Sequence, residues 1–294
     1  MSRHVATVGT FDGVHRGHRA IFDTMRAEAC GTMPAAFVVN PHPLAVLRMQ
    51  APSLLTDIDT RRRLIEDCGI AFHELKFDRD TAALTARQFM QMLADDHGID
   101  TLVMGHDNNF GSDRLRGADV YRTLGAETGI KVVTVPPLLT DSSQIISSSA
   151  IRSLLSQGDV TAANEMLGRM YSISGKVEKG MQLGRTIGFP TANVMTENTM
   201  QIPSNGVYAG YAAVSGDKTP ARAVINIGTA PTVRSDGHVK TEVHLLDGTH
   251  TDLYGKKITV FFKQKLRDEQ RFESIEQLRL QLNDDRNTAS AILR

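Results

Sequence analysis

The chain has 294 residues, 41% of them apolar and 22% charged, and its 33 Lys and Arg balance its 33 Asp and Glu. This composition excludes a disordered or fibrous protein, and the length predicts two domains that each bury their own core. The zero net charge excludes a global positive field of the kind that attracts nucleic acid or an anionic membrane. Any phosphate binding must therefore be local.

The number of cysteines and the distribution of apolar residues indicate in which cellular compartment the protein is expected. Cys30 and Cys68 are too few for a disulfide framework and lack the paired spacing of a structural zinc site. The first residues show no signal-peptide pattern, and no run of about eighteen apolar residues occurs. We therefore expect a cytoplasmic protein without nucleic-acid or membrane partners, and the sequence leaves its oligomeric state open.

The first half of the chain alternates β-rich runs with amphipathic helical patterns, which is typical of βαβ units around a parallel sheet. The predicted strands are Val5–Val8, Ala35–Val39, Thr101–Met104 and Lys131–Val135. The predicted helices are His15–Ala29, Asp57–Cys68 and Thr85–Asp96. This alternation predicts a doubly wound α/β domain.

The second half is a succession of strands followed by one helix. The predicted strands are Tyr171–Val177, Val207–Val214, Arg222–Ile227, Lys240–Leu245 and Ile258–Lys263. The helix is expected at Ser274–Asn283, where apolar residues recur on one face. This order predicts a small antiparallel β-barrel closed by a helix, which leaves few exposed edges. The change falls near Gly168, so we predict domains at residues 1–168 and 169–294.

The string GTFDGVHRGH, Gly9–His18, lies between the first predicted strand and the first predicted helix. Backbone N–H groups and the helix dipole favour phosphate at such a position. His15 and His18 are three residues apart, so both can reach one triphosphate. A tight turn with surface histidines is the alternative, but the combined pattern favours ATP. The residues predicted to bind ATP here are Gly9, Thr10, Phe11, Asp12, His15 and His18.

A second segment, ISSSAIR at Ile146–Arg152, follows the last predicted strand of the first half. Ser147 or Ser148 can cap the helix that follows, and Arg152 can neutralise developing phosphate charge. A plain helix cap is the alternative. Because strand ends of an open parallel sheet meet at the nucleotide crevice, we expect Ser147, Ser148, Ser149 and Arg152 to join the same ATP site.

In the second half, the string GRTIGFPTAN spans Gly184–Asn193. Thr191 and Asn193 offer oxygen ligands suited to Mg²⁺, and glycines allow a backbone to approach phosphate. A Gly/Pro-rich hairpin is the alternative. In TEVHLL, Glu242 alternates with apolar residues, so we expect it to face inward and accept a proton. An edge charge or half of a salt bridge is the alternative there.

These motifs together resemble the prokaryotic bifunctional riboflavin kinase/FMN adenylyltransferase family, also called FAD synthetase. Gly9–His18 resembles the GxxxxxHxGH pattern of nucleotidyltransferases, whose two histidines hold the α and β phosphates of ATP. GFPTAN resembles the flavokinase PTAN motif, and TEVHLL resembles the strand with the catalytic glutamate. The resemblance covers nearly the whole chain, whereas no GxxxxGK[ST] or GxGxxG string supports a Walker or nicotinamide site.

The resemblance implies two ATP-dependent reactions, riboflavin to FMN in the C-terminal domain and FMN to FAD with pyrophosphate release in the N-terminal domain. It implies Mg²⁺ as cofactor and small molecules as partners, with riboflavin, FMN and FAD as substrates or products. It assigns catalytic roles to Glu242, His15, His18 and Arg152, and Mg²⁺ binding to Thr191 and Asn193. Further residues that it assigns to ATP are Asp107, Lys176, Gly184, Thr191 and Asn193. Residues that it assigns to the flavin are Pro41, His42, Pro43, Arg267 and Phe272.

The chain departs from the family pattern at three positions. The family commonly has an acidic residue where Asn40 stands, and an aromatic then a basic residue where Asn108 and Asn109 stand. A riboflavin kinase with a decayed adenylyltransferase site is therefore one alternative, and a non-catalytic flavin-binding regulator is another. The His-x-x-His spacing alone also fits a tRNA-linked adenylating protein, which the neutral charge and the flavokinase half argue against.

Overall fold

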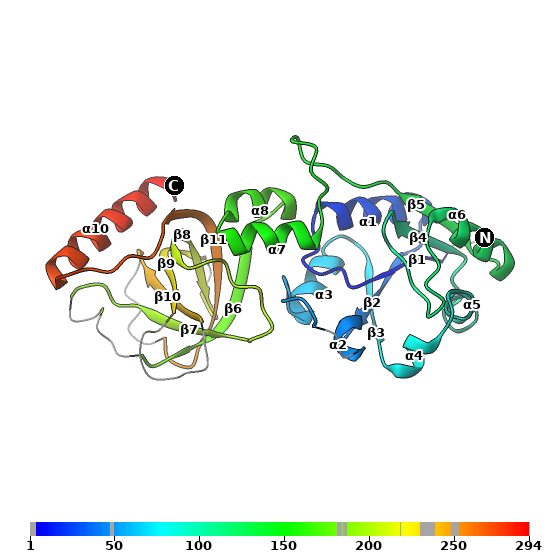
Figure 1. Cartoon of the computed structure of the whole chain (residues 1–294), viewed down its shortest axis with the longest axis horizontal. Coiled ribbons are helices and arrows are strands. Elements are labelled where there is room, and N and C mark those ends of the chain that lie inside the picture. Colours follow the sequence, from blue (N-terminus) through cyan, green and yellow to red (C-terminus); the bar gives the residue numbers. More distant parts are fainter. Residues whose placement is uncertain are drawn as a thin grey trace. The chain divides into compact units, whose positions relative to one another are not determined.

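The computed structural model describes residues 4–47, 50–180, 184, 187–217, 219–229, 239–247 and 253–293. The chain packs into two compact units, Met1–Ser148 and Ser149–Arg294, each with its own sheet (Figure 1). No helix in the described part of the chain combines the length and the apolar character needed to cross a membrane.

The first unit is built on a five-stranded sheet with the order β3-β2-β1-β4-β5. Its strands are β1 (Val5–Gly9), β2 (Ala35–Asn40), β3 (Ala71–Lys76), β4 (Thr101–Gly105) and β5 (Lys131–Val135). Every neighbouring pair is parallel. The central position of β1 places its C-terminal end, and the loop that follows, in the middle of one sheet edge.

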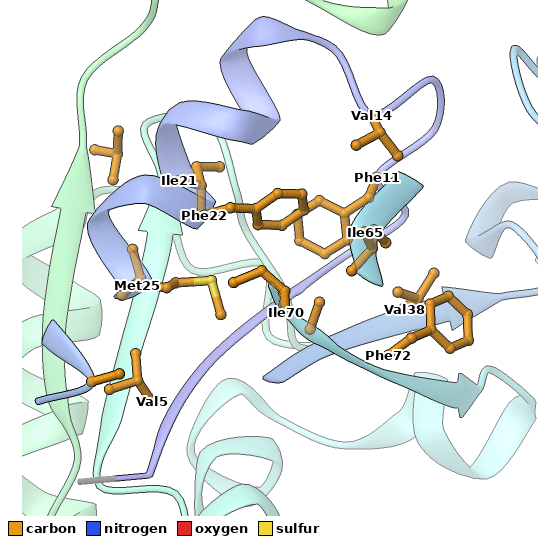
Figure 2. Close-up of a cluster of buried hydrophobic side chains, with 14 residues drawn as sticks. Val5, Phe11, Val14, Ile21, Phe22, Met25, Val38, Ile65, Ile70 and Phe72 are labelled. Atoms are coloured by element: carbon orange, nitrogen blue, oxygen red, sulfur yellow. The ribbon is translucent and has the colours of Figure 1, made fainter. Parts of the chain in front are cut away.

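Helices cover both faces of this sheet, which confirms the predicted doubly wound α/β fold. The covering helices are α1 (Arg16–Glu28) and α3 (Ile58–Glu66) on one face, and α5 (Ala86–His97) and α6 (Ala118–Thr128) on the other. The short helices α2 (Pro43–Val46) and α4 (Arg79–Ala83) lie in the connections and bury no residue. On one face, Val5 of β1 shares a buried cluster with Phe22 of α1 and Ile65 of α3 (Figure 2). On the other face, Ala6 shares a cluster with Met90 of α5. Adjacent β1 residues thus serve opposite cores, as the alternation of strand side chains requires.

The second unit is a closed antiparallel barrel with the strand order β10-β7-β6-β11-β8-β9. Its strands are β6 (Tyr171–Glu178), β7 (Ala192–Thr196), β8 (Gly206–Val214), β9 (Ala221–Thr229), β10 (Val239–Leu245) and β11 (Lys257–Arg267). The C-terminal helix α10 (Ile275–Ile292) packs Ala289 against Val207 and Val224 on the outer face of β8 and β9. The predicted barrel with a C-terminal helix is therefore confirmed.

Two further helices precede the barrel, α7 (Ser148–Gln157) and α8 (Val160–Leu167). Helix α8 packs against β6 and β11, and the Leu155 carbonyl of α7 accepts from the Ser204 N–H at 2.9 Å. The Asn164 side chain donates to the Phe262 carbonyl at 2.8 Å and accepts from the Tyr171 N–H at 2.6 Å. The packing thus divides the chain at Ser148/Ser149, while the sequence pattern changes only at Gly168. The domains 1–168 and 169–294 stay a prediction about function.

Several elements were not predicted from the sequence, namely β3, β7, α2, α4, α6 and α8. β3 is an edge strand with mixed polar and apolar residues, so it lacks a clear period-two pattern. α10 continues to Ile292, whereas the apolar pattern predicts an end at Asn283. The extra turns contain Asp285, which is 3% exposed because it pairs with Arg267 of β11. A buried carboxylate cannot be recognised from helix periodicity alone.

Asn164→Ala should destabilise the second unit, because it removes both hydrogen bonds by which α8 joins β6 and β11. Each lost bond to a buried backbone group costs about 1 to 3 kcal/mol. Hydrogen exchange of β6 and β11 at increasing urea concentration measures the change. The control Asn283→Ala removes only a bond to the Arg279 carbonyl within exposed α10. Equal protection in the two variants would contradict the expectation.

Candidate functional site

The loop between β1 and α1 has an unusual backbone that is held in place by its own apolar side chains. Phe11, Gly13 and Val14 have φ values of 47°, 84° and 40°, so the chain turns sharply after the strand. Phe11 and Val14 are buried in the cluster formed with α1, and the Phe11 ring lies 5.4 Å from that of Phe22 (Figure 2). Left-handed backbone is unfavourable for residues with side chains and persists where packing over-determines it.

Asp12 fixes the same loop from its polar side. Its carboxylate, 1% exposed, accepts hydrogen bonds from the backbone N–H groups of Leu55 and Thr56 at 3.0 and 3.1 Å. The Arg61 guanidinium of α3 pairs with it at 3.2 Å and also donates to the Thr10 carbonyl at 2.9 Å. The Asp12 carboxylate therefore binds groups of the protein, and these bonds fix the loop that the sequence assigns to ATP.

The two histidines of the motif lie together at the first turn of α1. The His15 Nδ1 atom accepts from the His18 backbone N–H at 3.3 Å, which makes His15 the N-cap of the helix. The two rings are stacked with centroids 3.6 Å apart, and the Phe11 ring meets His18 edge-on at 5.2 Å. The predicted pairing of the imidazoles on one helix face is thus present in the structure.

The second motif touches the first at two points. Ser148 donates its hydroxyl to the Asp12 carbonyl at 2.8 Å. A Cβ added at Gly17 would lie 3.3 Å from the Ile146 carbonyl and 3.1 Å from the His15 ring, so the two segments approach closely at this glycine. The structure therefore brings Ile146–Ser148 against the Gly9–His18 loop. Ser149 and Arg152 follow within α7, in the second unit.

Asn108 and Asn109, which depart from the family pattern, both have hydrogen bonds within the chain. Asn108 donates to the carbonyl of Val8, near the end of β1, at 2.6 Å. Asn109 donates to the Asp107 carbonyl at 2.8 Å. Asp107 itself is exposed beside His106, with 3.8 Å between the carboxylate and Nδ1. Asn108 thus stabilises the end of the strand that leads into the Gly9–His18 loop.

The loop assigned to the flavin follows β2. Asn40 donates to the Glu74 carboxylate of β3 at 2.7 Å. His42 caps α2 by accepting from the Leu44 N–H at 3.2 Å, and Pro43 occupies the first helical position. Pro41, His42 and Pro43 therefore form a short, well-defined turn, as expected for a rigid loop.

In the second unit, strand register places the predicted catalytic and metal-binding residues side by side. Glu242 of β10 is the direct partner of Asn193 of β7, and Asn193 is also the partner of Glu178 of β6. On its other side Glu242 faces Asn226 of β9. Directly opposed residues of antiparallel strands share one face of the sheet. Glu242 and Asn193 are therefore neighbours on one face of the barrel.

That face is the outer one, so the expectation that Glu242 points inward is wrong. Val243 is 1% exposed, whereas the Glu242 side chain is 26% exposed. The next residue on the Glu242 side, His244, is the register partner of Val224, which packs against Ala289 of α10 outside the barrel. The apolar neighbours fill the interior and leave Glu242 at the outer surface, where its carboxylate pairs with Lys240.

Asn193 provides a buried oxygen suited to a metal ion. Its side chain is 9% exposed, and its Oδ1 atom has no hydrogen-bond partner among the residues that the structure describes. A Cβ added at Gly180 would lie 2.1 Å from the Asn193 amide nitrogen, so the Gly180 backbone covers this side chain. A buried amide oxygen without a partner fits the hard-oxygen preference of Mg²⁺.

The remaining kinase residues lie on the same unit. Thr191 is exposed, and a Cβ added at Gly184 would lie 3.6 Å from its hydroxyl, so these two motif residues are close. Lys176 of β6 is the register partner of Met195 of β7. Met195 is two residues after Asn193, so Lys176 lies on the same face of the sheet as Asn193. The PTAN residues, Lys176 and Glu242 are thus brought together by β6, β7 and β10.

Arg267 and Phe272, which the sequence assigns to the flavin, lie near each other after β11. The guanidinium carbon is 5.9 Å from the Phe272 ring centroid. Arg267 also makes a bidentate pair with Asp285 of α10, with Nε–Oδ1 and Nη2–Oδ2 distances of 2.9 and 2.8 Å. This pair anchors α10 to the barrel, so Arg267 has a structural role whatever it does for a ligand.

Two residues near the sites were missed by the sequence reasoning, Arg61 and His244. Arg61 lies on a predicted helix as one of three consecutive arginines, and nothing local marks it as the partner of Asp12. His244 is the second residue after Glu242 and contacts the PTAN loop through the Pro190 carbonyl. The strand period of two was a usable signal for His244, because it puts both side chains on one face.

Comparison with known proteins finds relatives over nearly the whole chain. The FAD synthetase family model matches residues 1–150, and the riboflavin kinase family model matches residues 167–293. The chain is 39% identical to the bifunctional riboflavin kinase/FMN adenylyltransferase of Escherichia coli (strain K12), over 97% of this chain and 91% of the relative. It is 34% identical to the protein of the same name from Bacillus subtilis (strain 168), over 98% and 92%.

A solved structure supports the fold over nearly the full length. It is described as a macrolide-efflux protein from Streptococcus pneumoniae, and it matches with a TM-score of 0.88 and 28% identity, covering 98% of this chain and 94% of that one. The two domain models occur in the order in which the two sites occur here. The chain belongs to the bifunctional riboflavin kinase/FMN adenylyltransferase family.

Arg61→Met should lower the unfolding free energy of the first unit by about 3 to 5 kcal/mol, because it removes the cation paired with a buried carboxylate. Hydrogen exchange of β1 and α1 in urea reports this change. The control Arg63→Met alters the same helix at an exposed position, where the Arg63 side chain donates to the Thr60 hydroxyl at 3.2 Å, and should shift stability by about 0.5 kcal/mol or less. Matching urea midpoints for both variants would contradict the role given to Arg61.

Proposed function

We propose that this chain phosphorylates riboflavin to FMN on its barrel and adenylylates FMN to FAD on its parallel-sheet unit, with ATP as the co-substrate of both reactions. The observation that carries the proposal is the pairing of Glu242 with Asn193 across β10 and β7, in a chain that also has the two imidazoles of His15 and His18 stacked at the start of α1. The match of both family models favours this function over a kinase with a decayed first site and over a non-catalytic regulator.

In the kinase reaction, the Glu242 carboxylate accepts the proton of the terminal ribityl hydroxyl as that oxygen attacks the γ-phosphorus of ATP. The bond to the β–γ bridging oxygen breaks and ADP leaves. Thr191 and Asn193 would hold Mg²⁺, which neutralises phosphate charge when bound. Lys176 and the backbone at Gly184 are proposed to bind the phosphates of the same ATP. The orphaned Asn193 oxygen and the register of Glu242 support these roles.

In the adenylylation reaction, a phosphate oxygen of FMN attacks the α-phosphorus of ATP and pyrophosphate leaves. The nucleophile is already an anion, so the site needs to orient it and relieve charge repulsion more than it needs a base. His15 and His18 are proposed to hold the α and β phosphates at the start of α1, where the helix dipole also favours them. Ser147 and Ser148 lie beside the same loop.

The other residues of the first site have two kinds of proposed role. Gly9, Thr10 and Asp107 are proposed to contact ATP, while Phe11 and Asp12 hold the loop from behind. Ser149 and Arg152 follow Ser148 in α7 and are proposed for the same triphosphate on the strength of their motif.

Both flavin sites are also part of the proposal. Pro41, His42 and Pro43 are proposed to contact FMN in the first unit, and Phe272 with Arg267 is proposed to border the riboflavin ring in the second. The functional boundary is proposed at Gly168, where α8 ends with a left-handed glycine. We propose the cytoplasm as the location, because both cysteines are free and ATP is the co-substrate.

Glu242→Gln should abolish riboflavin phosphorylation, because the amide keeps the size of the side chain but cannot accept the proton. We expect FMN formation to fall by about 100-fold or more. Flavin chromatography after incubation with riboflavin and MgATP measures the rate. FAD formation from supplied FMN should stay at the wild-type level, and Glu197→Gln, an exposed carboxylate after β7, provides a matched control. A near-normal FMN rate in Glu242→Gln would rule out this base.

His18→Ala should have the opposite effect on the two reactions. We expect FAD and pyrophosphate formation from FMN and ATP to fall by about 100-fold, since a group that stabilises transition-state charge is lost. FMN formation from riboflavin should continue. His73→Ala, on the exposed edge strand β3, is the control. Wild-type protein that makes FMN but no FAD would instead support the alternative of a decayed first site.

A further inference from the structure

Thr191 lies in the loop between Gly184 and β7, and two backbone hydrogen bonds join the described residues of this loop. The Gly184 carbonyl accepts from the Phe189 N–H at 2.8 Å and from the Ile187 N–H at 3.3 Å, which closes a tight turn. The next two residues, Pro190 and Thr191, are exposed. Pro190 has no N–H, so its backbone can be fixed only through its carbonyl.

That carbonyl is bound by a side chain from the strand that carries the proposed base. The His244 Nδ1 atom lies 2.8 Å from the Pro190 oxygen. The His244 ring also packs against the Phe189 ring, with centroids 5.4 Å apart and planes at 56°. Two neighbouring residues of the loop are therefore held by one imidazole, through a hydrogen bond and a ring contact.

A residue of α10 also contacts this loop. The guanidinium carbon of Arg286 lies 5.9 Å from the Phe189 ring centroid. Burial lowers the pKa of His244, and the nearby Arg286 charge lowers it further, against the effect of the bond to Pro190. The neutral ring then binds the carbonyl as the Nδ1–H tautomer, because a carbonyl can only accept.

The geometry determines what this contact controls. The Pro190 carbonyl carbon is bonded to the Thr191 nitrogen, and the peptide unit is planar, so fixing the oxygen fixes the orientation of the peptide that leads into Thr191. Glu242 and His244 are two residues apart on β10 and share its outer face. Strand β10 therefore positions the Glu242 carboxylate directly and the Pro190–Thr191 loop through His244.

We propose that His244 is a positioning residue of the kinase site, which binds the Pro190 carbonyl and so holds Thr191 in place for magnesium-bound nucleotide. The proposal rests on the kinase function proposed above. His244 does not touch the reacting atoms in this scheme. Its effect is on nucleotide binding, through the loop, and leaves the riboflavin side of the reaction unchanged.

Three substitutions separate the hydrogen bond from the packing. His244→Ala removes both, His244→Phe keeps a ring against Phe189 without a donor, and His244→Asn places an amide nitrogen where Nδ1 stands. We expect the KM for MgATP in riboflavin phosphorylation to rise about tenfold in the Ala and Phe variants, which corresponds to about 1.4 kcal/mol. His244→Asn should stay within about threefold of wild type, and the KM for riboflavin should not change.

A binding measurement tests the same idea without turnover. Titration calorimetry of the full chain with ADP and Mg²⁺, after the first site is disabled by His18→Ala, should show affinity lost in the Ala and Phe variants and restored in His244→Asn. Equal affinity in all four proteins would overturn the inference, as would a loss of kcat and thermal stability at unchanged KM for MgATP. If the parent protein binds magnesium-ADP on the barrel yet makes no FMN, the proposed function fails while the loop contact is still tested.

Discussion

The loop between β1 and α1 depends on the buried carboxylate of Asp12, which is 1% exposed. Asp12 is buried against Arg61 and two backbone N–H groups, and this fixes a turn in which three residues have left-handed backbone. Such backbone is unfavourable by about 1 to 3 kcal/mol at each residue that carries a side chain. A buried ion pair persists where further hydrogen bonds satisfy both partners. The position of His15 and His18 at the next helix turn follows from that fixed turn.

The proposed kinase site positions its residues in a different way. Its residues stand on paired strands of a closed barrel, so their separation is set by strand register and needs no buried charge. Glu242 and Asn193 face outward because the interior of the barrel is already filled by apolar side chains. A site on the outer face needs a cover, and here the Gly180 backbone lies on Asn193 while the Phe189–Pro190 turn lies against His244.

The sequence was sufficient where the signal is local. Strand and helix periods identified the parallel-sheet unit, the barrel and α10, and the motif spacings marked His15, His18, Thr191 and Asn193. It was insufficient where a residue depends on a distant partner. Arg61 meets Asp12 across 49 positions, and the buried Asp285, in the part of α10 that was not predicted, pairs with Arg267 of β11. The inward orientation expected for Glu242 was wrong because the alternation places its apolar neighbour Val243 inside the barrel and Glu242 on the opposite, outer face.

The departures from the family pattern can be understood in the same physical terms. A substitution changes a ligand contact only where the side chain faces the ligand, and Asn108 instead donates to Val8 at the end of β1. An amide can make this bond, whereas an aromatic side chain has no donor for the carbonyl unless it is a tyrosine or tryptophan. Asn40 is likewise held by Glu74 of the neighbouring strand. Asn108 thus joins the segment after β4 to β1, and Asn40 joins β2 to β3, so both amides stabilise the strands that lead into the β1–α1 loop and the Pro41–Pro43 turn.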